Sequence, residues 1–133
     1  QTFAFGSGKV TASYGSATAQ LIADTLYTAQ NETDGLGTEG EVRYKGLKSL
    51  HKDRVNEQAG SILSATDWYS IRAADGGTAV PSSVSTHRTA VRTKANAMCT
   101  LIDNASDVDA LAALYVYNDA ETPVRPLGEF PTL

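Results

Sequence analysis

Two histidines and one cysteine are the residues of this 133-residue chain best suited to nucleophilic chemistry. Such chemistry needs a base within hydrogen-bond reach of the nucleophile and a third group that orients the base. Neither His51 nor His87 stands in a glycine-rich turn, and Cys99 falls within a predicted helix, on the side expected to be buried. We therefore expect a core thiol at Cys99 and an interfacial His87, and we predict no catalytic residue.

One acidic segment resembles a metal site. Gln30-x-Glu32-x-Asp34-Gly35-x₅-Glu41 has the spacing of a calcium-binding loop, in which glycine takes the turn and the last glutamate binds with both oxygens. Gln30, however, stands where that loop requires aspartate, and no clear helix follows Glu41. The better interpretation is an acidic surface loop over residues 30–41, and calcium binding there stays open. We assign no metal ligands.

Patterns for other ligands are weaker. Gly6-Ser7-Gly8-Lys9 lacks the spacing of a phosphate-binding loop. Trp68-Tyr69 could form a platform for a sugar or a base, but a lone tryptophan at a helix end is more often a core anchor. We therefore expect no cofactor and no small-molecule substrate.

Charge is segregated along the chain. A net charge of −4, from 15 acidic and 11 basic residues, argues against a nucleic-acid partner, because such binding requires a basic face that displaces counterions. Acidic residues gather in 24–41, and basic residues follow directly in 43–54. This alternation can orient a subunit against a complementary neighbour. Two solvated faces of one domain would produce the same pattern.

The sequence gives no sign of a membrane or of an oxidising compartment. No apolar run reaches the roughly 18 residues of a membrane span, and no signal-peptide pattern is present. A single cysteine cannot form an intrachain disulfide. We expect synthesis in the cytoplasm and no membrane partner.

Two long amphipathic helices are predicted to position the residues discussed above. Apolar residues recur at three- and four-residue steps over residues 47–74 and again over 81–105. Asp75-Gly76-Gly77 should end the first helix and Pro81 should begin the second, because glycine tolerates the left-handed conformation and proline presets a first turn. The pattern predicts an antiparallel helical hairpin.

Shorter elements are predicted on both sides of the hairpin. Residues 1–15 alternate in hydropathy, which indicates one or two short strands or an extended arm. A helix is predicted over 17–29, where the β-branched content also permits a strand, and a loop is predicted over 30–46. Ser106 should cap a short third helix, and the prolines after residue 116 favour an extended tail.

The predicted fold is therefore mainly α. It has an N-terminal β-like arm over residues 1–15 and a single α-rich domain over 16–131, in which a Pro-rich C-terminal tail follows the third helix.

A motif across the hairpin carries a resemblance to a known group of proteins. Thr66-Asp67-Trp68 after an apolar pair, then Pro81, then Arg88 and Arg92 four residues apart, is similar to the pattern of the phage tail assembly chaperone and tail-fibre-associated group. That group includes small proteins of marine and cyanobacterial phages. The resemblance covers residues 47–131 discontinuously.

Two positions depart from the pattern of that group. His87 replaces the tyrosine expected before the first arginine, and Phe130-Pro131 stands where Trp-Pro is expected.

The resemblance implies a non-enzymatic structural protein of a tailed-bacteriophage virion, in the tail or tail-fibre region. It would bind other phage structural proteins in multiple copies. The alternative is a tail or tail-fibre assembly chaperone that is absent from the mature virion. A small enzyme or lysis-related hydrolase is a third hypothesis, which the lack of a catalytic set disfavours.

The same motif marks a structural or interaction site. Asp67 is predicted near a helix C-terminus, where Arg88 and Arg92 of the facing helix can pair with it. Trp68 is expected to pin the base of the hairpin. The residues assigned to this site are Asp67, Trp68, Tyr69, Arg72, Pro81, Arg88, Arg92, Phe130 and Pro131.

Overall fold

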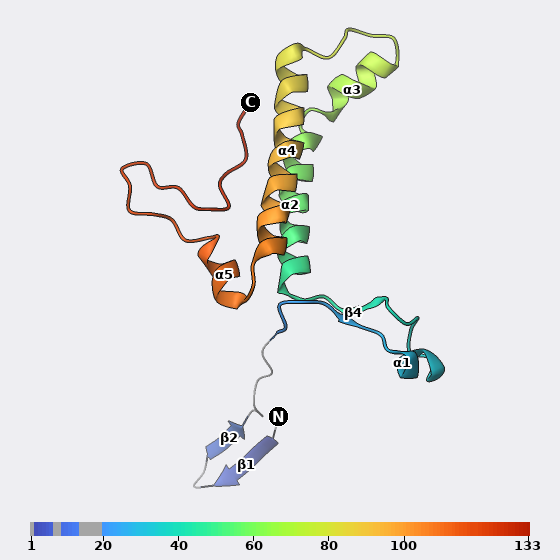
Figure 1. Ribbon diagram of the computed structural model, residues 1–133, viewed down its shortest axis with the longest axis vertical. Coiled ribbons are helices and arrows are strands. Elements are labelled where there is room, and N and C mark those ends of the chain that lie inside the picture. Colours follow the sequence, from blue (N-terminus) through green and yellow to red (C-terminus); the bar gives the residue numbers. More distant parts are fainter. Residues whose placement is uncertain (1, 7–8, 14–19) are drawn as a thin grey trace.

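Two helices packed as an antiparallel hairpin form the centre of the molecule (Figure 1). In the computed structural model, which describes residues 2–6, 9–13 and 20–133, these are α2 (Leu47–Ser64) and α4 (Ser82–Asn104). Pro81 directly precedes α4 with φ of −56°, close to the helical value. The predicted mainly α fold with a central helical hairpin is confirmed.

The hydrophobic core lies along one face of α4. Three of its side chains, Met98, Ile102 and Val91, are almost completely buried, and α2 contributes Val55 and Ala59 opposite them. The buried side chains of α4 follow the predicted stripe. Helix α5 (Val108–Ala113) and the C-terminal tail close the lower end of this core, through one buried leucine each.

The predicted single helix over residues 47–74 is two helices. Helix α2 ends at Ser64, and α3 (Asp67–Ala74) diverges from the hairpin beside the start of α4 (Figure 1). The turn between them is closed by a hydrogen bond from Thr66 N–H to the Leu63 carbonyl, 3.0 Å. Apolar spacing continues across this turn, which is why periodicity alone predicts one helix.

The predicted helix over residues 17–29 is wrong in its described part. β3 (Thr25–Leu26) pairs antiparallel with β4 (Val42–Tyr44), and α1 (Ala29–Thr33) lies between them. Thr28 begins α1, because its hydroxyl accepts from Asn31 N–H while the Asn31 side chain accepts from Thr28 N–H. The predicted loop over 30–46 therefore contains most of a short helix and a strand.

Asp24 fixes this segment to the start of α2. Its carboxylate accepts hydrogen bonds from Gly46 N–H at 2.6 Å and from the Ser49 hydroxyl at 2.8 Å. These bonds lower the pKa of Asp24, and a negative charge is favourable at a helix N-terminus. Gly46 is required here, because a Cβ would collide with the backbone of Ala23.

The two ends of the chain are extended. β1 (Thr2–Gly6) and β2 (Lys9–Ser13) form an antiparallel hairpin, which confirms the β-like arm for the described residues. From residue 116 onward the tail contains neither helix nor strand, as predicted. Among the described helices, none has the length and apolar character needed to cross a membrane.

Helix α5 begins one residue later than predicted. Asp107, not Ser106, is its N-cap, and its Oδ1 accepts from Ala110 N–H at 2.8 Å. The Ser106 hydroxyl donates to the other carboxylate oxygen instead, at 2.9 Å. Both bonds favour the ionised carboxylate and lower the pKa of Asp107, the bond from Ala110 contributing most.

Candidate protein-contact site

Arg88 joins the two halves of the motif identified in the sequence. From α4, its Nη1 donates to the Leu63 carbonyl at 2.8 Å and to the Thr66 hydroxyl at 2.7 Å, and its Nη2 pairs with Asp67 at 2.8 Å. The side chain of Arg88 is only 12% exposed. A single guanidinium therefore satisfies a carbonyl at the end of α2 and also holds the first residue of α3.

Asp67 lies at the opposite helix end from the one predicted. It is the first residue of α3, where its charge is favourable to the helix dipole without any need for compensation. The expected pairing with Arg88 is present, but Arg92 does not share it. Arg92 is exposed on α4, and within the described residues its side chain has no hydrogen-bond or ion-pair partner.

Trp68 does not anchor the core, contrary to the sequence prediction. It is 49% exposed on α3, because the break after Ser64 turns this helix away from the hairpin. Its ring stacks on Tyr69, with centroids 3.7 Å apart and an interplanar angle of 29°. The Arg72 guanidinium lies 4.9 Å from the Trp68 ring centroid and 5.4 Å from that of Tyr69.

The end of α3 holds Arg72 in place. Gly77 N–H donates to the Arg72 carbonyl at 2.9 Å and Gly76 N–H to that of Ala73 at 3.2 Å, which is the Schellman arrangement. Gly76 has the positive φ, 82°, that this motif needs. Both ends of α3 are therefore fixed, and Trp68, Tyr69 and Arg72 form a defined surface that we call the α3 platform.

Phe130 and Pro131 lie against the hairpin near the junction of α2 and α3. His87 Nε2 is 3.1 Å from the Pro131 carbonyl, which places Nε2–H as the donor. Phe130 packs on the edge of the core. A cavity of about 370 Å³ lies between these tail residues and the side of the junction that carries Ile62 and Thr66. The tail thus covers His87, which is 9% exposed.

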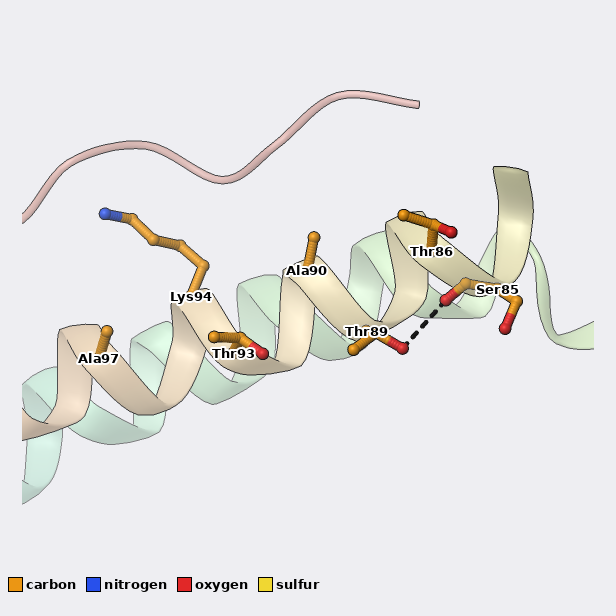
Figure 2. Close-up of a pocket in the computed structure, with 7 residues that line it drawn as sticks. All are labelled: Ser85, Thr86, Thr89, Ala90, Thr93, Lys94 and Ala97. Carbon is orange, nitrogen blue, oxygen red and sulfur yellow. Dashed lines mark hydrogen bonds between the residues drawn. The ribbon is translucent and has the colours of Figure 1, made fainter. Parts of the chain in front are cut away.

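An open groove of about 570 Å³ runs along the outer face of α4 (Figure 2). Its floor is made of alanine and threonine side chains, and Thr89 donates to the Ser85 carbonyl within the helix. Lys94 extends from this face toward the passing C-terminal tail. The side chains that line this groove include no histidine, cysteine or carboxylate.

Cys99 and His87 do not form a catalytic pair. They are twelve residues apart on one straight helix, which separates them by roughly 18 Å. Burial raises the pKa of the Cys99 thiol, and its sulfur lies 4.0 Å from the Asn56 amide oxygen. His51 instead contacts the Tyr115 hydroxyl at 2.6 Å.

Side chains of the acidic segment around α1 form hydrogen bonds within that segment. Gln30 donates to Asp34 at 2.8 Å, and Glu32 accepts from Glu39 N–H at 3.2 Å. No cluster of three metal-ligating side chains is present in the part of the chain that the structure describes.

The separate helix α3 is the feature that the sequence prediction missed. Thr66 followed by Asp67 is a typical helix start, with a capping residue before an acidic first turn, and it was the available signal. The Thr66 hydroxyl does not cap α3, however, but donates to the Leu63 carbonyl and accepts from Arg88.

Comparisons with known proteins give no match to this chain: no protein-family model, no curated protein and no solved structure is similar to it.

Proposed function

We propose that this chain is a non-enzymatic structural protein of a tailed-bacteriophage virion, in the tail or tail-fibre region. The observation that carries the proposal is the α3 platform. The stretch that resembles the phage group contains Asp67 and Arg88, whose ion pair fixes a helix that presents Trp68 to solvent. An exposed, preorganised aromatic surface is typical of a protein-contact site.

The amount of exposed surface supports a role in assembly. The chain exposes 9372 Å², whereas a compact monomer of 14.0 kDa exposes roughly 6,700 Å². A chain of this shape has surface available for neighbours in a virion, after its synthesis in the host cytoplasm.

Large apolar side chains lie on several parts of this surface. On α3, Ile71 is 62% exposed next to Trp68, and on the tail Tyr117, Val124 and Leu133 are exposed. Large exposed apolar patches are rare on monomeric proteins, and where they occur they mark interaction sites. The partners we propose are other structural proteins of the same phage.

Mass spectrometry of purified particles tests this proposal. We expect peptides of the chain in virions of the phage that encodes it, in several copies per particle relative to a tail protein of known copy number. Absence from purified virions would overturn the structural role. Recovery from infected cells in complex with a tail protein, together with absence from particles, would establish the assembly-chaperone alternative.

A further inference from the structure

The α3 platform lacks an anionic partner. Arg72 lies over two aromatic rings, yet no ion pair to it is present among the described residues, and its Nε is buried without a hydrogen-bond acceptor. A ligand that completes this site would bring a carboxylate to Arg72 and a compact apolar ring to Trp68. An acidic peptide that contains proline has both a carboxylate and such a ring, and proline rings dock readily on exposed aromatic side chains.

The C-terminal tail of this same chain contains such a segment. Asn118 N–H donates to the Val124 carbonyl, and Val124 N–H donates to the Asn118 side-chain oxygen, both at 2.9 Å. These two bonds close a loop whose exposed tip carries Asp119, Glu121 and Pro123. Neither carboxylate has a hydrogen-bond or ion-pair partner within the described residues. The loop is preorganised, which lowers the entropic cost of binding.

The two surfaces cannot meet within one molecule. Helix α3 diverges on one side of the α2–α4 hairpin, and the tail that carries the 118–124 loop extends on the other side (Figure 1). We propose that the α3 platform of one copy binds the 118–124 loop of a second copy. Because the two surfaces lie on opposite sides of the hairpin, two copies do not make both contacts with each other, so the contact is heterologous and builds rings or filaments.

This inference names a partner for the contact surface on which the proposed function rests. Arg72 pairs with Asp119 or Glu121 of the second copy, and Trp68 packs on its Pro123. Complementary charge fixes the orientation of the two copies, and the aromatic contact supplies most of the binding energy.

Sedimentation velocity of purified chains, up to roughly millimolar concentration, tests the proposal. The wild-type chain should form species larger than a dimer as concentration rises. Two variants each remove one half of the contact: Trp68→Ala on the platform, and Asp119→Lys with Glu121→Lys on the loop. Loss of a central aromatic residue should raise the dissociation constant at least about 30-fold. Leu21→Ala, which truncates a similarly exposed side chain near the start of α2, should assemble like the wild type.

A mixture of the two variants gives the decisive result. Each variant retains the half that the other lacks, so an equimolar mixture should form dimers and nothing larger. Circular dichroism checks that both variants keep the helical content of the wild type.

Three results would overturn the inference: a wild-type chain that stays monomeric, assembly that survives the loop charge reversal, and a mixture that stays monomeric. The last two would assign the α3 platform to a symmetric contact or to another protein. None of them bears on the presence of the chain in virions, so the inference and the proposed function fail independently.

Discussion

Arg88 shows why one arginine of a pair four residues apart is structural and the other is not. Its side chain crosses to the turn between α2 and α3, where it meets the Leu63 carbonyl, a buried hydroxyl and a carboxylate. Arg92 lies one helical turn further from that junction and points to solvent. Both arginines fit the sequence motif equally well, but only Arg88 lies beside the turn between α2 and α3.

Replacing Arg88 should destabilise the fold. Arg88→Met keeps the apolar stem but leaves the Leu63 carbonyl and the Thr66 hydroxyl without their charged donor, and we expect the free energy of unfolding to fall by about 2–3 kcal/mol. Urea denaturation measures this change. The matched control, Arg92→Met, should change it by less than about 0.5 kcal/mol. Equal effects of both substitutions would contradict the role given to Arg88.

Truncating Trp68 should have a small effect on stability. Trp68→Ala removes a stacked, half-exposed ring and one cation–π contact, which should cost about 1 kcal/mol. Met98→Ala in the core should cost about 2–5 kcal/mol, because Met98 is 1% exposed. Thermal unfolding of both variants distinguishes the two environments. A larger loss for Trp68→Ala than for Met98→Ala would place Trp68 in the core after all.

His51 should make stability depend on pH. Burial lowers its pKa from 6.5, and the nearby Arg54 lowers it further, so between the folded-state pKa and 6.5 the unfolded chain binds more protons. Stability should therefore decrease as pH falls below about 6.5.

His51→Asn removes the titrating group and keeps a polar side chain that can hydrogen-bond with the Tyr115 hydroxyl. The difference in unfolding free energy between wild type and variant, measured from pH 7.5 to 5, should shrink on the acidic side. A difference that is constant with pH would refute the assignment.

Among the elements of the fold, the C-terminal tail has no helix or strand and yet closes one end of the hydrophobic core. Leu127, 2% exposed, is its buried anchor, and Leu127 N–H donates to the Leu114 carbonyl at 3.0 Å. Glu129 fixes the bend around it, accepting from the Tyr117 hydroxyl at 2.6 Å and pairing with Arg125 at 2.7 Å. The Tyr117 bond is the main reason that the pKa of Glu129 is lowered.

Loss of the Leu127 side chain should release the tail. Leu127→Ala should cost about 2–5 kcal/mol, whereas Val124→Ala, at an exposed position of the same tail, should cost less than about 0.5 kcal/mol. Hydrogen exchange adds a local readout, since the N–H of Leu127 should lose protection in the first variant only. Retained protection would mean that the other tail contacts are sufficient without Leu127.

Sequence periodicity predicts the hairpin well and its interruption poorly. The glycine and proline signals at Gly76 and Pro81 locate the long connection, because both act through their own backbone. Thr66-Asp67 is a local signal for the break, but the bond that holds the break comes from Arg88, 22 residues away, and apolar periodicity does not report that contact. The position of Trp68 follows from this break, so its predicted burial was wrong for the same reason.

Long-range bonds also explain the error in the N-terminal part. Residues 20–29 have apolar spacing that suits a helix, but Asp24 is held by Gly46 and Ser49, and β3 pairs with β4. These partners lie 22 and 25 residues away from Asp24. The short helix α1 has a recognisable cap at Thr28, which would have placed its start correctly.

At the scale of the whole molecule, a narrow core supports a large surface. Ten apolar side chains of the described residues are buried, most of them along the α2–α4 hairpin. Such a chain buries a small share of its apolar surface on folding and leaves exposed apolar groups that a neighbouring molecule can bury. The proposed role in a virion and the proposed contact between copies both use this property, through the α3 platform.

Trp68 is the only tryptophan of the chain, so its fluorescence reports on the α3 platform alone. The most direct test is acrylamide quenching of this emission in the dilute chain and again in the assembled form. We expect strong quenching in the dilute chain, because Trp68 is half exposed, and clear protection with a blue-shifted emission on assembly. Weak quenching already in the dilute chain, or unchanged quenching on assembly, would contradict the claim that α3 is the contact surface.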